Sequence, residues 1–249
     1  MRKYLIGMGV WNKRDMIPWL VSGLSEHARG AAEIAVVFDS CVDGSEARFD
    51  EVSREITGPR VTKMRSRGEE LNEIGVDDVL MHYFVNDTDC DALVVLHDDQ
   101  RLTGPMLLQL DGALDEIGED AGFIGGRDGY HPNLRGMVSS EWSESTLAER
   151  RLRDGEWARR PLVNPAPLVW TRRAIERVGR LNREFEAFYW WNDYAHRCIL
   201  AGLTNAIMGT PITHMKFGGV PKTKYVGDGS QARDAARVER IWGRIGLAD

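Results

Sequence analysis

An apolar stretch in the middle of the chain ends in two adjacent carboxylates. Of all the residues in the sequence, these are the clearest candidates for a chemical role. Residues 93–96 read Leu-Val-Val-Leu, and they are followed directly by His97, Asp98, Asp99 and Gln100. A short apolar run bounded by polar residues is typical of a strand buried on both faces of a parallel sheet. Ligands of open α/β sheets bind at the carboxyl ends of such strands. Two carboxylates there would suit a hard divalent cation, which in turn suits the phosphates of a nucleotide.

The same acidic pair also has an ordinary structural interpretation. Carboxylates after a strand often lie in a solvated turn or cap the next helix. Here Thr103 offers a separate cap and Pro105 lies in the expected first turn, so the pair is not needed for capping. A two-residue acidic motif is nevertheless common by chance. The surrounding elements have to decide between the two interpretations.

Length and composition describe an ordinary globular protein. The chain has 249 residues, of which 43% are hydrophobic and 28% charged, enough for one larger α/β domain. A net charge of −6 disfavours broad electrostatic binding to nucleic acid. No apolar stretch approaches the ~20 residues of a membrane span, and residues 12–15 turn polar too early for a secretory signal, so we expect a cytoplasmic protein. Cys41, Cys90 and Cys198 lack metal-ligand spacing and are expected to be reduced thiols.

The first half of the chain alternates predicted strands with predicted helices. In the first helix, Ile17, Leu20, Val21 and Leu24 fall at i, i+3, i+4 and i+7. Strand, helix, strand units of this length have parallel strands and right-handed crossovers. The pattern predicts a Rossmann-like, mostly parallel sheet flanked by helices, with the acidic residues that end its strands on one edge. The predicted strands cover residues 4–10, 34–38, 61–64, 93–96 and 123–126.

The second half of the chain is less regular. Residues 127–166 contain Trp142 and a cluster of arginines and show little periodicity. A long irregular insert beside a ligand crevice is more often functional than idle. Further strands are predicted at residues 168–170 and 203–208. The last helix, with apolar residues at helical spacing between 238 and 245, is expected to pack back on the sheet.

The order of these parts resembles the nucleotide-sugar glycosyltransferases of GT-A fold, in particular the large second family. The resemblance covers roughly residues 4–215 and depends on several segments in the expected order, each weak alone and fairly specific together. They are the acidic strand end at Asp39, the DXD-type motif at 96–100, the helix at 170–179, the segment 185–202 with Arg197 and Gly202, and His214 after the next strand.

The resemblance implies a role for each candidate site residue. Asp39 would contact the nucleotide base and Asp98 a ribose hydroxyl. Asp99, together with His214, would bind Mn²⁺ or Mg²⁺. Asp193 would be the catalytic base that takes the acceptor's proton. Further contacts to the nucleotide sugar are expected from Arg65, Lys222 and Lys224, and stacking on sugar faces from Trp142, Trp190 and Trp191.

The sequence departs from the family pattern in two places. The acidic motif is Asp-Asp-Gln rather than Asp-X-Asp, with Gln100 as a possible further oxygen ligand. The usual Glu-Asp pair ahead of the acidic helix aligns onto Trp190 and Trp191, so Asp193 matches only the second acidic residue of that motif. Asp193 can also be interpreted as a plain helix cap, and the two tryptophans as core residues. Both interpretations remain open at this point.

These observations favour a metal-dependent, inverting glycosyltransferase that uses a nucleoside diphosphate sugar. We expect a single GT-A domain over residues 1–249, with a nucleotide-sugar half at 1–126 and an acceptor half at 127–249 that includes the last helix. The acceptor could be a glycan, a lipid-linked glycan, a small molecule or a modified nucleobase. One alternative is a sugar nucleotidyltransferase, although residues 7–14 make a poor glycine-rich phosphate loop. Another is a non-catalytic sugar-nucleotide or glycan-binding protein that has lost its base.

Overall fold

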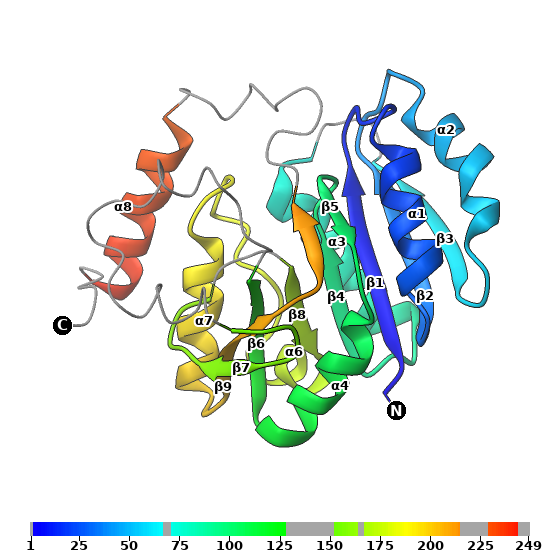
Figure 1. Ribbon diagram of the computed structural model, residues 1–249. Helices are drawn as coiled ribbons and strands as arrows, with labels where there is room; N and C mark the ends of the chain where they lie inside the picture. Colours follow the sequence, from blue (N-terminus) through cyan, green and yellow to red (C-terminus); the bar gives the residue numbers. More distant parts are fainter. Residues whose placement is uncertain (1, 67–70, 128–151, 164–166, 215–228, 244–249) are drawn as a thin grey trace.

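The computed structural model describes residues 2–66, 71–127, 152–163, 167–214 and 229–243. These residues form an α/β structure built around one large sheet (Figure 1). The strands are β1 (Tyr4–Val10), β2 (Ala31–Phe38), β3 (Arg60–Arg65), β4 (Ala92–Leu96), β5 (Gln100–Leu102), β6 (Ala121–Arg127), β7 (Trp157–Arg159), β8 (Leu168–Thr171), β9 (Thr204–Gly209) and β10 (Ile212–His214). The helices are α1 (Ile17–His27), α2 (Ser45–Val52), α3 (Glu73–Asp87), α4 (Met106–Ile117), α6 (Arg172–Val178), α7 (Trp190–Leu200) and α8 (Ser230–Trp242), with a 3₁₀ turn at Ser53–Glu55.

The large sheet joins strands from both halves of the chain. Within the described residues its order is β3-β2-β1-β4-β8-β6-β9-β7. Neighbours among β3, β2, β1 and β4 are parallel, and so are β6 and β9. Strand β8 is antiparallel to both β4 and β6, so β4 and β6 point the same way. The sheet is therefore mostly parallel, as the sequence pattern predicts, and the carboxyl ends of its parallel strands share one edge.

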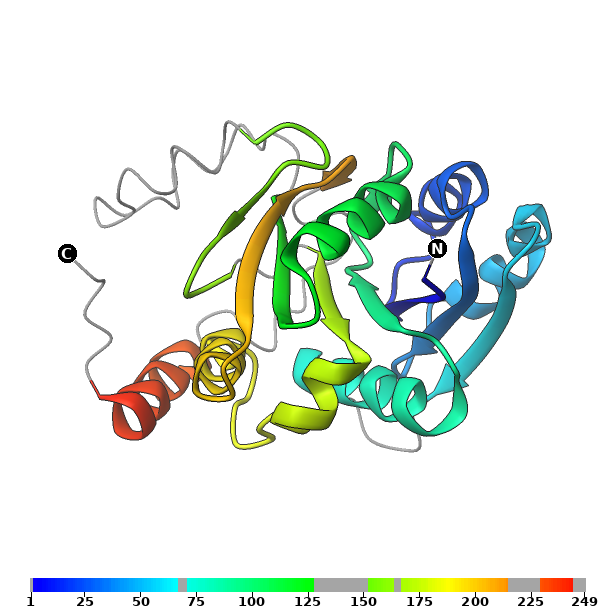
Figure 2. The same cartoon turned by 90° about the horizontal axis from the view of Figure 1, so that it is seen from below.

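Two layers of helices cover the two faces of the sheet (Figure 2). Alternate residues of each strand enter opposite cores: Tyr4 and Ile6 face the layer that contains α1, α2 and α4, whereas Leu5 faces the layer that contains α3, α6 and α7. Burial on both faces explains why β4 reads as an uninterrupted apolar run, because all five of its residues are at most 2% exposed.

Several element boundaries confirm the sequence interpretation. The predicted strands 4–10, 34–38, 61–64 and 123–126 are found as β1, β2, β3 and β6 with small changes at their ends. Thr171 caps α6, since its hydroxyl accepts a hydrogen bond from the N–H of Ala174 at 3.1 Å. In the part of the chain that the structure describes, no helix is long and apolar enough to cross a membrane.

The structure also corrects two expectations and adds one strand that the sequence did not predict. Thr103 is not a helix cap: a short strand, β5, comes first, and α4 begins after Pro105 without a side-chain cap. Residues 212–214 form strand β10, which pairs with β5 in a second, two-stranded sheet. Helix α8 packs mainly against α7 rather than on the sheet, with Val238 as its buried apolar contact. An amphipathic pattern indicates which face is buried, but not against which partner.

Candidate functional site

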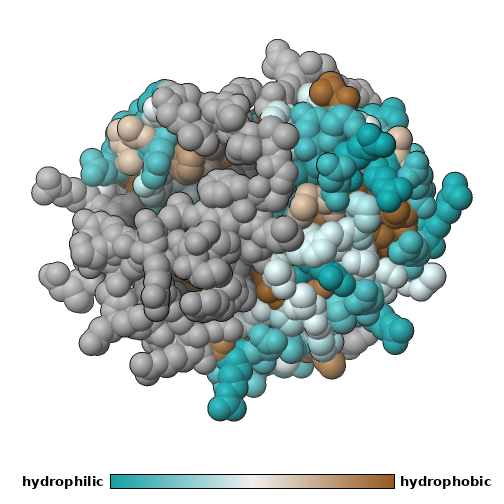
Figure 3. All heavy atoms as spheres, turned by 45° about the horizontal axis from the view of Figure 1, so that its top comes forward, coloured by the Kyte–Doolittle hydropathy of each residue, from teal (hydrophilic) through white to brown (hydrophobic). Residues whose placement is uncertain are grey.

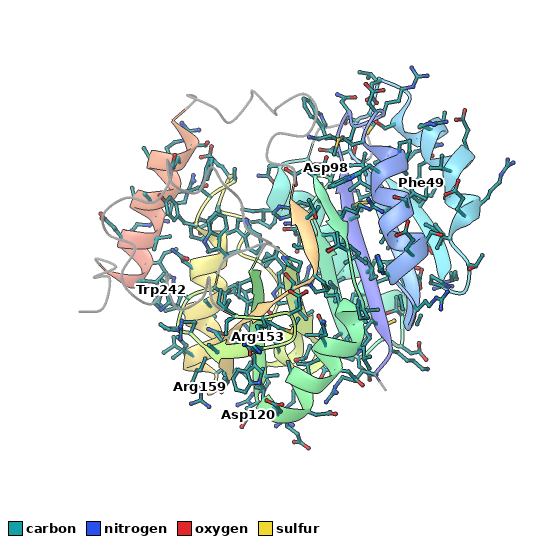
Figure 4. The ribbon with its side chains drawn as sticks, viewed as in Figure 1. Phe49, Asp98, Asp120, Arg153, Arg159 and Trp242 are labelled. Carbon is teal, nitrogen blue, oxygen red and sulfur yellow. The ribbon has the colours of Figure 1, made fainter. Side chains whose placement is uncertain are left out.

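The ends of β1, β2 and β4 lie side by side and bring the predicted acidic residues to one edge. Val10 pairs with Phe38 across β1 and β2, so Asp39 follows immediately at the end of β2. Its backbone N–H donates to the carbonyl of Val10 at 2.9 Å. On the other side, the carboxylate of Asp98 accepts from the N–H of Trp11 at 3.1 Å. The loop after β1 therefore lies between Asp39 and Asp98. Figure 4 shows Asp98 where β1 and β4 end.

Asp39 is fully buried at this edge. Its Oδ1 accepts a hydrogen bond from the N–H of Leu71 at 2.8 Å, which ties the end of β2 to the segment that leads into α3. A carboxylate can accept about four hydrogen bonds, so Asp39 has the chemistry to accept one from a nucleobase N–H. The position of Asp39 is compatible with the predicted contact to the base. Asp39 also has a structural role, because it holds the segment before α3.

Asp98 and Asp99 are the two central residues of a tight turn. The N–H of Gln100 donates to the carbonyl of His97 at 3.1 Å, and the N–H of His97 donates back to the side-chain Oε1 of Gln100, also at 3.1 Å. Gln100 is only 1% exposed. Its oxygen thus closes the turn, a structural role that the sequence interpretation did not include. Its buried Nε2 has no hydrogen-bond partner among the described residues, a costly state unless a ligand uses it.

The charge of Asp98 is costly in this environment. The pKa of its carboxyl group is raised to about 6, because burial and the neighbouring Asp99 raise it while Lys13 opposes the shift. The Nζ of Lys13 lies 3.7 Å from Oδ1 of Asp98, and the lysine is itself 8% exposed. Two adjacent carboxylates concentrate negative charge in this turn, and a divalent cation bound there would neutralise it.

Strand pairing brings His214 next to the acidic turn. In the small sheet, His214 of β10 lies opposite Gln100 of β5, one residue beyond Asp99. The side chain of His214 lies outside the described atoms. Among the side chains that are described, no three potential metal ligands form a group. Carboxylate oxygens with an imidazole nitrogen suit Mn²⁺, so the residues at the end of β4 and in β10 have the right chemistry for the predicted ion.

The loops after β1 and β2 contain site features that the sequence interpretation missed. Asn12 and Ser40 have φ angles of 49° and 50°, the left-handed region that non-glycine residues rarely occupy. Such strain persists where the surroundings enforce it and is concentrated at functional sites. Trp11 and Lys13 belong to the same loop and contact Asp98. The signal in the sequence is the group of polar residues, 12–15, directly after an apolar strand.

Arg65 lies at the end of β3, opposite Phe38 of β2, and therefore at the same edge. Its guanidinium makes two hydrogen bonds of 2.7 Å to Glu46 of α2, and this contact raises the pKa of Arg65. The side chain is 72% exposed, so it can exchange this partner for a ligand at small cost. Three other predicted contacts, Lys222, Lys224 and Trp142, lie outside the described residues.

Trp190 is a core residue rather than the sugar-stacking platform that we expected. It is 1% exposed and stacks on Trp170 of β8, with ring centroids 6.2 Å apart. Trp191 differs, because its side chain is only partly buried and packs edge-on against Trp190. It also lies 6.0 Å from the ring of Tyr189, which is likewise partly exposed. The accessible aromatic pair at the start of α7 is therefore Tyr189 with Trp191.

Asp193 is enclosed by structural partners. It is 2% exposed and lies in the first turn of α7. One oxygen accepts from Nε of Arg197 at 3.0 Å, and the other accepts from the indole Nε1 of Trp242 at 2.9 Å. Asp193 thus joins α7 to α8, on the side of the molecule that Figure 4 marks with Trp242. A general base needs a free lone pair within reach of the acceptor, and this geometry favours a structural role instead.

Figure 3 shows the carboxyl edge turned toward the viewer. The described atoms visible there are mostly hydrophilic, with smaller hydrophobic patches between them. Such an edge suits a polar ligand whose charge is neutralised by a few specific groups.

Comparison with solved structures identifies the fold. A mannosyltransferase, PcManGT from Pyrobaculum calidifontis in complex with GDP-Man and Mn²⁺, matches with a TM-score of 0.54 at 14% identity over 84% of this chain. S. aureus TarS matches with a TM-score of 0.61 at 10% identity over 95% of the chain. GalNAc-T7 with UDP, GalNAc and Mn²⁺ matches with a TM-score of 0.67 at 11% identity over 97%.

Together with the strand order, these similarities show that the chain has the GT-A fold. The chain spans only 55%, 40% and 48% of the lengths of these three structures, respectively. No protein-family model matches the sequence, and no curated protein matches it either. At such low identity the likeness establishes the fold, and the function has to be argued from the site.

Proposed function

We propose that the protein transfers a sugar from a nucleoside diphosphate sugar to an acceptor hydroxyl, with inversion at the anomeric carbon and with Mn²⁺ or Mg²⁺ as cofactor. One observation carries the proposal: Asp39 and the Asp98-Asp99 turn meet at the carboxyl edge of a GT-A sheet, and His214 pairs beside them. The solved neighbours that contain GDP-Man or UDP with Mn²⁺ support it.

The chemistry requires that the leaving diphosphate be neutralised as the glycosidic bond breaks. A divalent ion bound by Asp99 and His214 would supply that neutralisation as a Lewis acid. The raised pKa of Asp98 is consistent with a site that is completed by added positive charge. Asp98 would then accept a hydrogen bond from a ribose hydroxyl, and Asp39 from the base. Lys13, buried beside Asp98, would keep that carboxylate ionised.

Further residues are proposed to contact the donor and the acceptor. Arg65 would exchange Glu46 for the donor, and Lys222 and Lys224 would approach the diphosphate. Trp142 and Trp191 would contact the sugar or the acceptor. The catalytic base stays assigned to Asp193 only as a prediction, because both of its oxygens already have partners.

That last point favours a second candidate, a protein that binds nucleotide sugars without transferring them. In this alternative Trp190 and Trp191 replace the acidic pair, and Asp193 serves only to join two helices. A sugar nucleotidyltransferase has no such support, because the loop after β1 is closed by Asp98 and Asp43 contacts rather than built as an open phosphate cradle.

One experiment separates these candidates. The protein is incubated with UDP-glucose, UDP-N-acetylglucosamine, UDP-N-acetylgalactosamine or GDP-mannose and Mn²⁺, with methyl glycosides as acceptors. Glycosyl transfer releases nucleoside diphosphate, faster with acceptor than with water alone. Mn²⁺-dependent binding of the donor without turnover would support the binding protein. Absence of any Mn²⁺-dependent nucleotide binding would disprove both, and EDTA serves as the matched control.

A further inference from the structure

A buried carboxylate on α8 organises the segment that leads into α7. Asp234 is fully buried, and its oxygens accept hydrogen bonds from three consecutive backbone N–H groups, those of Glu186, Ala187 and Phe188, at 2.8 to 3.1 Å. Arg237 donates to the same carboxylate from one turn further along α8. Three adjacent N–H groups that converge on one anion form a nest, which fixes the backbone of that segment.

The segment ends in a strained residue. Tyr189, directly after the three N–H donors, has a φ of 57° and precedes the first residue of α7 without a side-chain cap. A bulky residue is uncommon in the left-handed region and persists there only when its surroundings enforce it. The Asp234 contacts supply that enforcement on the preceding side. On the following side, Asn192 donates its N–H to the carbonyl of Tyr189 at 2.9 Å.

The strand directions place this segment at the carboxyl edge. Helix α7 leads into β9, which runs parallel to β6, and β6 points the same way as β4. A helix that precedes a parallel strand begins at the carboxyl edge of the sheet. The start of α7 is therefore on the edge that also carries Asp39 and Asp98. Asn12, Ser40 and Tyr189, the non-glycine residues with positive φ in the described chain, thus all belong to this edge.

The described charged side chains beside the aromatic pair form ion pairs with one another. On α8, Arg233 and Arg237 pair with Glu186, and Arg240 pairs with Glu184. With Asp234 counted, three cations face three carboxylates. These described charges are paired with one another, and the neighbouring, partly exposed Tyr189 and Trp191 offer aromatic surface to a neutral ligand.

We propose that Asp234 is a positioning residue for the acceptor side of the site: it fixes the backbone at 186–188 and thereby orients Tyr189 and Trp191 to bind a neutral pyranose ring of the acceptor. The inference rests on the proposed glycosyl transfer. It adds two residues, Asp234 and Tyr189, that the sequence interpretation did not assign, and it names the acceptor class as a glycan rather than a nucleic acid.

The test compares Asp234→Asn with Trp242→Phe, a control that removes the hydrogen bond from α8 to Asp193 but leaves the N–H nest intact. Hydrogen exchange is measured on the peptide that covers residues 184–191. Asp234→Asn should accelerate it by about tenfold, since local opening governs exchange, and Trp242→Phe should leave it unchanged. Equal acceleration in both variants, or in neither, would overturn the positioning role.

Ligand binding is followed in the same variants by saturation-transfer NMR with methyl β-D-glucopyranoside and methyl α-D-mannopyranoside. Asp234→Asn should weaken the glycoside signal about fivefold through loss of preorganisation, while the affinity for UDP or GDP with Mn²⁺ stays unchanged. Tyr189→Asn serves if Asp234→Asn does not fold, because asparagine tolerates the left-handed region. It should lose the glycoside signal without faster exchange.

Two further results would overturn the inference. They are no glycoside signal in the wild-type protein, and a signal from a 5-hydroxymethylpyrimidine nucleoside in place of the glycosides. Failure of the proposed function has a different signature. In that case the wild-type protein does not bind nucleotide with Mn²⁺, regardless of the hydrogen-exchange rate of the peptide 184–191.

Discussion

The carboxylate of Asp98 accepts a hydrogen bond from the backbone N–H of Trp11 at 3.1 Å, which ties the end of β4 to the loop after β1. The same carboxylate faces Lys13 at 3.7 Å and adjoins Asp99 in the turn. Enclosure by these groups explains why burial raises its pKa from an ordinary value of 3.8 to about 6. The donor site is therefore assembled at a cost in stability, and that cost can be measured.

Asp98 should destabilise the protein near neutral pH. Because its pKa is higher in the folded than in the unfolded state, the folded state binds the proton more tightly, and this contribution to stability is lost as the pH rises from about 4 through 6. The shift corresponds to about 3 kcal/mol. Asp98→Asn should accordingly raise the melting temperature at pH 7.5 and leave it unchanged at pH 4 in thermal denaturation without added metal. Asp89→Asn is the control, because Lys3 lowers the pKa of Asp89. Equal melting temperatures for Asp98→Asn and wild type at pH 7.5 would contradict the shift.

Asp99→Ala should abolish metal-dependent nucleotide binding with the fold intact. Loss of a charged metal ligand should weaken the affinity for UDP or GDP by at least about tenfold in Mn²⁺, with little effect in EDTA. Calorimetric titration gives the affinity and circular dichroism checks the fold. Asp89→Ala, at the opposite end of β4, is the matched control. Unchanged affinity in Mn²⁺ would remove Asp99 from the site.

Gln100→Leu should loosen the acidic turn. The side-chain oxygen that accepts from His97 is lost, a contact worth about 1 kcal/mol. Misplacement of Asp98 and Asp99 should then weaken Mn²⁺-dependent nucleotide binding. If Gln100→Leu binds nucleotide as well as the wild type, the turn does not depend on this side chain.

Asp193→Asn separates a structural role from a catalytic one. It breaks a buried ion pair with Arg197, a change that costs about 3–5 kcal/mol when one partner remains charged. The structure therefore predicts a lower melting temperature with nucleotide affinity retained. A catalytic base would give the reverse result, namely normal stability with turnover lost. Trp242→Phe removes the other contact of Asp193 and should show part of the same destabilisation.

Much of the fold could be predicted because its signals are local. Apolar runs at β1, β2 and β4 and helical spacing in α1 are properties of a few consecutive residues. Asp39 and Asp98 could be placed on one edge because parallel strands end together. By contrast, β5 and β10 have three residues each, too short to show a period. The antiparallel direction of β8 has no local signature either.

The parts of the site that could not be predicted depend on contacts between distant segments. Asp193 meets Trp242 across 49 residues, and Asp234 meets Glu186 across 48. In each case the sequence shows an acidic residue, but it does not show which group donates a hydrogen bond to that carboxylate. Trp190 likewise carries no mark that separates a core ring from an exposed one, whereas its stacking on Trp170 decides the matter.

The position of β8 has a consequence for how the chain folds. Strand β8 pairs with β4 on one side and with β6 on the other. The two parts of the sheet therefore cannot be joined until residue 171 has been synthesised. Until then the hydrophobic flank of β4 presents unpaired backbone groups, a template for aggregation. A fragment that stops after β6 would keep this exposed flank permanently, so the nucleotide half is expected to need the rest of the chain as an intramolecular partner.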